Sequence, residues 1–277
     1  MAQKIAWMNR RIKILRNSML RGKLGGSASD WLRNCFGPTC GVLARRLTCR
    51  SEVVGDFREI ELKGVEGTLY VNKRVPSISI KQAIAEQCYA WQWHYYQVPE
   101  TTVSERDVVF DCGCAEGIFP FLVKGRAAKI VCFEPLPEFL IGLKKTFSSC
   151  PSIHIVEAAL GDNAGDAYLR EAGIMSTISK TPNGIPVKIT TIDRYCAETG
   201  IIMTYLKADV EGYEMPLLRG ASGVIKKFKP KIAITTYHLK GHAEEIKGFL
   251  QNLVPSYHFA TKGIEANFGE PVKLHAW

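Results

Sequence analysis

The stretch VVFDCGCAEGIF, residues 108–119, places an apolar run directly before a glycine-rich turn. The run indicates a buried strand, and the turn, D-x-G-x-x-x-G from Asp111 to Gly117, leads into a short helix. The dinucleotide fingerprint G-x-G-x-x-G is different, because a pyrophosphate requires close backbone approach and a helix N-terminus. The sequence therefore predicts a strand–turn–helix unit with a binding loop that is not built for a dinucleotide.

Alternating strands and helices follow this unit along the rest of the chain. This alternation is typical of a parallel sheet with helices on both faces, in which ligands bind at the carboxyl ends of the strands. We therefore expect an α/β fold with its site at strand ends. The expected strands are 129–134, 154–160, 205–210 and 231–237, the helices 137–148, 212–227 and 242–253, a β excursion 167–171 and 187–193, and a closing antiparallel pair 257–262 and 272–277.

Upstream of residue 105 the chain has a different character. Residues 1–58 hold 12 Lys or Arg and 3 Asp or Glu, so that this part carries the whole net charge of +9 and the remainder is neutral. We divide the chain into this basic extension, a linking segment 59–104 and a main domain 105–277. A basic amphipathic helix is predicted over 4–21, a hairpin from 57–62 and 68–73, and a helix near 80–97; the apolar stripe of the first helix is Ile5, Met8, Ile12, Leu15 and Met19.

Acidic residues end the first two predicted strands. Asp111 ends one, and Glu134, 23 residues later, ends the next, which is about the offset at which an acid binds ribose hydroxyls. A cofactor without phosphate requires room for its chain and an acid for a cationic group. S-adenosylmethionine fits, because both its amino group and its sulfonium are positive. Glu116, inside the loop, joins the candidate cofactor-binding residues.

Further acids follow the fourth strand. Asp209, Glu211 and Glu214 are either an acidic first helical turn, which the helix dipole favours, or the lining of an acceptor pocket. His238, at the end of the fifth strand, is a candidate base. We take Asp209, Glu211 and His238 as the candidate catalytic residues. A divalent metal held by Asp209 and Glu211 is an alternative way to acidify a hydroxyl group, whereas H-x₃-H from His238 to His242 lacks the usual zinc motif.

Five segments resemble the FkbM family of S-adenosylmethionine-dependent methyltransferases. They are VVFDCGCAEGIF (108–119), VCFEPLPEFL (131–140), EAALGD (157–162), LKADVEGYEMPLLRG (206–220) and KPKIAITTYHL (229–239). The resemblance implies a Rossmann-like core with a seven-stranded sheet, and methyl transfer to the oxygen of a sugar or natural-product hydroxyl. By position it assigns to the cofactor Asp111, Gly113, Gly117 and Glu134, with Ala159 and Asp162 near the adenine.

The chain departs from this family at two places. Cys114 and Ala115 replace residues that are often Ala and Asn, so that the loop presents different side chains but the same backbone. Many members carry Glu at the end of the fifth strand, where this chain has Tyr237-His238.

Other functions and partners stay open at this point. The alternatives are a methyltransferase of RNA or protein, and a non-catalytic cofactor-binding scaffold; the neutral main domain and the lack of an N-P-P-Y motif argue against nucleic acid. Nine scattered cysteines without C-x-x-C favour reduced thiols and a cytoplasmic protein. Residues 1–26 are expected to pack on the core or on a second subunit of a homo-oligomer, to contact an anionic membrane peripherally, or to act as a targeting peptide.

Overall fold

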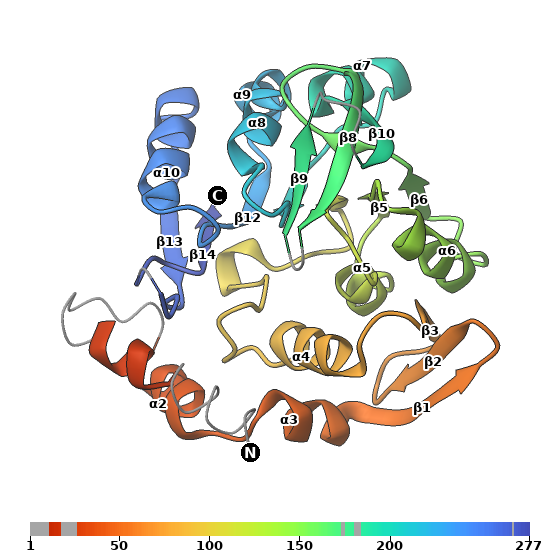
Figure 1. Ribbon diagram of the computed structural model, residues 1–277. Coiled ribbons are helices and arrows are strands. Elements are labelled where there is room, and N and C mark those ends of the chain that lie inside the picture. Colours follow the sequence, from red (N-terminus) through yellow and green to blue (C-terminus); the bar gives the residue numbers. More distant parts are fainter. Residues whose placement is uncertain (1–10, 18–26, 173–174, 180–183, 268) are drawn as a thin grey trace.

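The computed structural model describes residues 11–17, 27–172, 175–179, 184–267 and 269–277, with a seven-stranded sheet at the centre (Figure 1). The strand order is β13–β14–β12–β11–β4–β5–β6. β14 runs antiparallel to its two neighbours, and all other pairs are parallel, which confirms the predicted mostly parallel α/β sheet. The strands are β4 (Val108–Cys112), β5 (Lys129–Phe133), β6 (Ile153–Val156), β11 (Tyr205–Ala208), β12 (Lys231–Thr235), β13 (Phe259–Lys262) and β14 (Lys273–Ala276).

The central strands are buried on both faces. All four residues of β11 and four of the five in β4 are buried. Continuous burial requires a continuous apolar run, which is why these strands stand out in the sequence. Two polar residues interrupt the pattern, Asp111 on β4 and Lys207 on β11, and they are register partners on adjacent strands.

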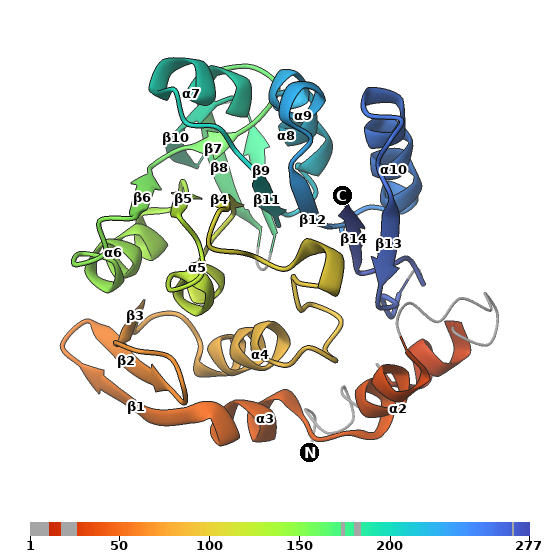
Figure 2. The same ribbon diagram turned by 180° about the vertical axis from the view of Figure 1, so that it is seen from behind.

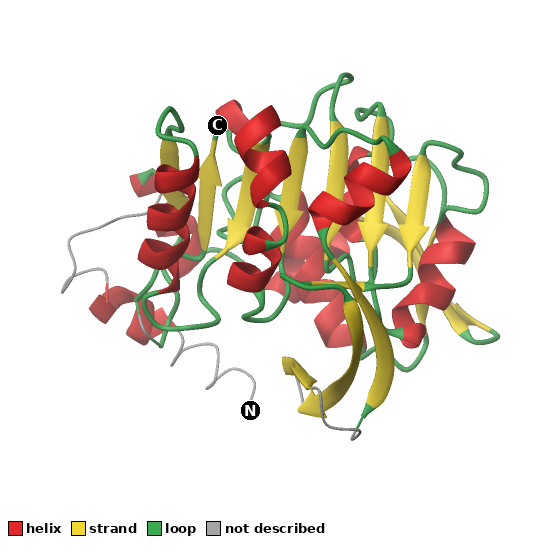
Figure 3. Cartoon of the chain, turned by 90° about the horizontal axis from the view of Figure 1, so that it is seen from above, coloured by secondary structure: helices red, strands yellow, loops and turns green. Residues whose placement is uncertain are grey.

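Helices form a layer on each face of the sheet (Figures 1 and 3). Buried side chains of three helices pack in one apolar cluster, and those of four others pack in a second cluster. The first group is α4 (Ser77–Cys88), α5 (Ile118–Val123) and α6 (Pro137–Thr146); the second is α7 (Ile192–Thr199), α8 (Glu214–Arg219), α9 (Ser222–Phe228) and α10 (His242–Leu253).

Three helices differ from the prediction. The helix expected over 212–227 is divided into α8 and α9, and Gly220, which lies between them, approaches the Gly161 carbonyl so closely that a Cβ would collide with it. α7 was not predicted; it begins after Thr191, whose hydroxyl accepts a hydrogen bond from the Arg194 N–H as an N-cap. α4 ends at Cys88, earlier than the expected end at residue 97.

A three-stranded antiparallel sheet precedes the core, in the order β1 (Thr48–Val54), β2 (Phe57–Leu62) and β3 (Leu69–Asn72). The β2–β3 hairpin is as predicted. β1 was missed because six of its seven residues are exposed, so that it carries no apolar alternation. The predicted boundary after residue 58 falls within β2. Seen from behind in Figure 2, this sheet and α3 (Cys40–Leu47) lie along the α4–α6 side of the molecule.

The β excursion forms a separate four-stranded sheet, in the order β7–β10–β8–β9. The strand expected over 154–160 is divided between two sheets: β6 stays in the central one and β7 joins this one. The turn between them brings Ala158 and Ala159 to the carboxyl edge of the central sheet. The strands are β7 (Ala159–Leu160), β8 (Gly165–Ala172), β9 (Met175–Ser179) and β10 (Ile185–Thr190).

Residues 11–17 are helical, and their buried face includes only part of the predicted stripe, because Leu15 is partly buried and Ile12 is exposed. Ile12 of the predicted stripe is 56% exposed, whereas Ile14 is 4% exposed and packs with Trp93 and Ile264. Asn17 donates a hydrogen bond to the Ala266 carbonyl at 2.9 Å. The predicted stripe residues Ile5, Met8 and Met19 lie outside the described residues. In the described part of the chain, no helix is long and apolar enough to cross a membrane.

Candidate active site

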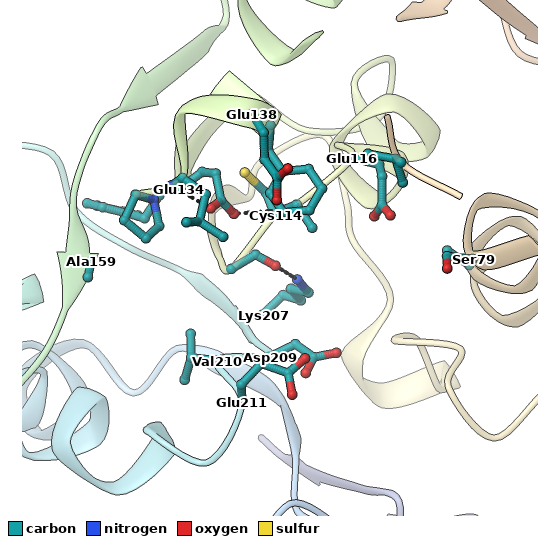
Figure 4. A pocket seen from close by; sticks show the side chains of 18 of the residues that line it. Ser79, Cys114, Glu116, Glu134, Glu138, Ala159, Lys207, Asp209, Val210 and Glu211 are labelled. Carbon is teal, nitrogen blue, oxygen red and sulfur yellow. Dashed lines mark hydrogen bonds between the residues drawn. The ribbon is translucent and has the colours of Figure 1, made fainter. Parts of the chain in front are cut away.

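A cavity of about 590 Å³ lies at the carboxyl ends of β4, β5 and β11 (Figure 4). Its wall includes five of the predicted cofactor and catalytic side chains and several residues that precede the main domain. The predicted residues in the lining are Gly113, Glu116, Glu134, Ala159, Asp209 and Glu211, of which Gly113 contributes backbone. The added residues include Arg74, Ser79, Glu86, His94, Tyr96 and Tyr237.

The loop after β4 requires glycine at two positions. Gly113 has a φ of +73°, and a Cβ there would collide with the Asp209 carbonyl. Gly117 has a φ of +77°, and a Cβ would lie 2.5 Å from Leu143 Cδ2 on α6. Gly113 therefore lets the loop lie against the end of β11, and Gly117 lets α5 pack on α6. Gly117 shapes the loop from behind and does not line the cavity.

Glu134 is held by the same loop. Its carboxylate accepts hydrogen bonds from the N–H groups of Ala115 and Leu136, both at 2.9 Å, and the residue is 4% exposed. Burial raises the pKa of Glu134 to about 7, against the effect of these two donors. Both carboxylate oxygens retain further lone pairs for ligand hydroxyl groups.

Asp111 occupies a different environment from Glu134. It is fully buried, and its Oδ1 lies 2.8 Å from Lys207 Nζ. The same ammonium group donates to the Gly113 carbonyl at 2.7 Å. Burial alone would lower the pKa of Lys207, but Asp111 and Asp209 raise it, so that Lys207 is charged. The structure thus places Asp111 behind the cavity wall, with its charge compensated by Lys207.

Asp209 is surrounded by donors. Its Oδ2 accepts a hydrogen bond from the Tyr96 hydroxyl at 2.5 Å, and its Oδ1 lies 3.3 Å from the Thr235 hydroxyl. Burial by itself would raise the pKa of Asp209, but Lys273, His238 and Lys207 lower it to about 2. Asp209 is therefore an anion at neutral pH and a weak base.

His238 lies behind Asp209 and Glu211 with a side chain that is 3% exposed. Its Nδ1 is 2.8 Å from Glu214 Oε1, and its Nε2 is 3.4 Å from Glu211 Oε2. Burial opposes the charged form, but the hydrogen bond to Glu214 and the nearby acids raise the pKa of His238 to about 9. His238 is therefore an imidazolium at neutral pH, which makes it a donor and not a base.

Glu211 is the third candidate catalytic residue. Its side chain is 38% exposed at the cavity, and its backbone φ is +54°, a strained value for a residue with a Cβ. Burial and then the charge of Asp209 raise the pKa of Glu211 to about 7. Asp209, Glu211 and His238 also offer ligand atoms that lie within 4.8 Å of one another.

Asp162 lies apart from the other predicted residues. It is exposed, its Oδ2 is 3.5 Å from Arg219 Nε, and it does not belong to the cavity lining. Tyr96 was missed because its contact with Asp209 joins residues 113 positions apart. Lys207 had a local signal, a lysine inside an otherwise apolar strand.

Comparison with known proteins decides the family. The family model of the methyltransferase FkbM domain matches residues 111–259. The chain belongs to the FkbM methyltransferase family. A comparison with curated protein sequences gave no match.

A solved structure shares the fold of this FkbM protein. A methyltransferase FkbM from Methylobacillus flagellatus is 18% identical with a TM-score of 0.51, covering 74% of this chain. Our chain spans 56% of the length of that protein. A methyltransferase from Agrobacterium tumefaciens is 9% identical with a TM-score of 0.45, over 81% of this chain and 70% of its own. A Streptococcus mutans protein in complex with SAH is 10% identical with a TM-score of 0.39, and the match covers 63% of this chain and 89% of that protein.

Proposed function

We propose that this protein transfers the methyl group of S-adenosylmethionine to a hydroxyl oxygen of a sugar, glycan or small natural product. One observation carries the proposal: Glu211, a carboxylate with a pKa near neutrality, faces the same cavity as the glycine loop and Glu134. The family supplies the class of cofactor. The proposal that the methyl acceptor is a hydroxyl group is based on the acids after β11, Asp209 and Glu211.

The cofactor fits the residues at the ends of β4 and β5. Backbone at Gly113 leaves room that a Cβ would fill, and Glu134 offers oxygens for the two ribose hydroxyls. Ala159 and Leu160 offer an apolar surface for adenine. When bound, S-adenosylmethionine supplies an electrophilic methyl group on its sulfonium. In the overall displacement an oxygen–carbon bond forms as the carbon–sulfur bond breaks, and the hydroxyl proton passes to a base.

A base is required because a hydroxyl is a very weak acid. Its pKa resembles that of water, about 15.7, so that full ionisation at neutral pH would cost about 12 kcal/mol. Removal of the proton during methyl transfer avoids this cost when the pKa of the base lies near the working pH. Of the three candidates, Glu211 meets this condition, since Asp209 has a pKa of about 2 and His238 is protonated.

Asp209 and His238 then have positioning roles. The His238 imidazolium lies 3.6 Å from Asp209 and 3.4 Å from Glu211, and it holds both carboxylates at the cavity. Asp209 raises the pKa of Glu211 and lines the cavity as a fixed anion. A divalent metal on Asp209 and Glu211 would compete with this arrangement, because the protonated His238 already supplies positive charge there.

Transfer of a labelled methyl group to a panel of acceptors tests the proposal. We expect label in hydroxylated sugars, glycans or small alcohols, and none in RNA or protein. Glu211→Gln should lower kcat by about 10²- to 10⁴-fold, with affinity for S-adenosylmethionine within about twofold of wild type. Glu105→Gln, an exposed acid at the opposite edge of the sheet, is the control. Label in RNA or protein, or full turnover by Glu211→Gln, would overturn the proposal.

Treatment with EDTA distinguishes proton removal by Glu211 from activation of the hydroxyl by a bound metal. If Glu211 acts as the base, turnover of the chelated protein equals that of the untreated protein. Loss of turnover that Mg²⁺ or Mn²⁺ restores would instead assign Asp209 and Glu211 to a metal.

A further inference from the structure

The acceptors at the end of β4 are already occupied by a cation of the protein. Lys207 Nζ lies 2.8 Å from Asp111 Oδ1 and 2.7 Å from the Gly113 carbonyl oxygen. Asp111 is the acid that the sequence offered to the cationic part of the cofactor. A second ammonium placed at the same atoms would meet the charge of Lys207 at close range, and like charges repel strongly in a buried site. The amino group of the cofactor therefore requires another acid.

Six acids line the cavity, and most have a partner or a role. Asp209 accepts from Tyr96 and Thr235, and Glu86 Oε1 accepts from Gln82 Nε2 at 3.0 Å. Glu134 faces the ribose position, and Glu211 faces the acceptor. Two remain, Glu116 in the loop after β4 and Glu138 in the first turn of α6. Glu138 is exposed, and Figure 4 shows it between Glu134 and Glu116.

Glu116 lies where the amino-acid part of the cofactor would extend. In Figure 4, Ala159, Glu134 and Glu116 follow one another along the cavity. Adenine, ribose and methionine follow one another in the same order in S-adenosylmethionine. Among the described residues no other side chain hydrogen-bonds the Glu116 carboxylate, and its burial raises its pKa, so that a cationic ligand would stabilise its charged form.

We propose that Glu116 binds the α-ammonium group of S-adenosylmethionine, while Asp111 serves to hold Lys207. This assignment rests on the proposed function, because it takes the cavity as the cofactor site. Asp111, at the end of β4, compensates a buried lysine, and Glu116, in the loop that follows, recognises the ligand.

Three probes that differ only in the amino-acid part test the assignment by isothermal titration. S-adenosylmethionine carries both the ammonium and the carboxylate, decarboxylated S-adenosylmethionine keeps only the ammonium, and 5′-methylthioadenosine lacks both. Glu116→Gln should weaken the binding of S-adenosylmethionine and of its decarboxylated form by about 10- to 100-fold. It should weaken the binding of 5′-methylthioadenosine by less than about threefold. Glu105→Gln is the control outside the cavity, and Glu138→Gln tests the competing acid.

The outcomes separate this assignment from the proposed function. Binding of 5′-methylthioadenosine by Glu116→Gln shows that the variant is folded. Wild-type affinity of Glu116→Gln for both ammonium-bearing probes overturns the assignment alone, and so does selective loss in Glu138→Gln. Wild-type protein that binds none of the three probes overturns the proposed function together with this subsite.

Discussion

The protonation state and role of each acid in this site depend on the charged groups next to it. Asp111 is buried and Asp209 is half-buried, both at strand ends. Lys207 compensates Asp111, while Tyr96, Thr235, His238 and two lysines surround Asp209. Neither is left as a base. Glu211, two residues after Asp209, has no such set of donors and its pKa is raised to about 7. The division of roles among identical functional groups thus follows from their neighbours.

The pairing of His238 with Glu214 predicts a pH-dependent stability. The pKa of His238 rises from 6.5 in the unfolded chain to about 9 in the folded protein. The folded state therefore binds the extra proton between these values, so that the contribution is complete below about pH 6.5 and is lost as the pH rises through about 9. His238→Gln should lower the free energy of unfolding by at most about 3 kcal/mol at pH 6.

At pH 10 the free energies of unfolding of wild type and His238→Gln should differ little. Urea denaturation of both proteins at the two pH values measures this difference. A difference that is equal at pH 6 and pH 10 would show that His238 contributes through packing and not through its charge.

At the scale of elements, the loop after β4 depends on its close approach to the end of β11. Gly113→Ala adds a Cβ that collides with the Asp209 carbonyl and imposes a left-handed backbone on alanine. We expect it to lower the free energy of unfolding by at least about 2 kcal/mol and to weaken cofactor binding. Gly125→Ala, with open space around its Cβ, is the matched control. Equal thermal stability of the two variants would contradict the close approach.

The elements that the sequence predicted well are those with a continuous apolar pattern. β4, β5, β12 and α10 agree with the expected segments within about two residues, because burial on both faces or a regular helical stripe determines them locally. β1 failed because its stability comes from pairing with β2 and not from burial. Gly220, between α8 and α9, lies against the carbonyl of Gly161, about 60 positions away, a contact that no local pattern contains.

For the whole molecule, the site joins the FkbM domain to the segment before it. Strand-end acids predicted Glu134, Asp209 and Glu211 at one edge of the sheet, and the structure brings them to one cavity. Tyr96, Ser79 and Arg74 complete the wall from outside the matched range 111–259. Their contribution depends on how α4 and the following chain pack on the core, which short-range spacing does not encode.

Packing of residues 11–17 on the core predicts a sharp contrast between two isoleucines. Ile14 is 4% exposed beside Trp93 and Ile264, and Ile12 is 56% exposed. Ile14→Ala should lower the free energy of unfolding by about 2–4 kcal/mol, as for other buried isoleucines, and Ile12→Ala by less than about 0.5 kcal/mol. Chemical denaturation of both variants measures this. Equal values would show that the segment does not dock in solution.

Peripheral membrane contact through residues 1–26 stays a prediction. The basic residues there would each contribute about 1 kcal/mol near an anionic surface. Full-length protein should then sediment with anionic vesicles at low salt, and a variant that starts at residue 27 should not. Absence of both from the vesicle pellet would reject the contact, and binding by both would place it on the main domain.

In the proposed function, Glu134 and the loop after β4 bind S-adenosylmethionine. Glu134→Gln keeps the shape of the side chain but removes a charge that would accept the ribose hydroxyl groups, which should weaken binding by about 10- to 100-fold. Isothermal titration of S-adenosylmethionine into wild type and Glu134→Gln measures this directly. We expect one site per chain in wild type and a loss of affinity of about 10- to 100-fold in the variant. No binding by wild type, or equal affinity in the two proteins, would contradict it.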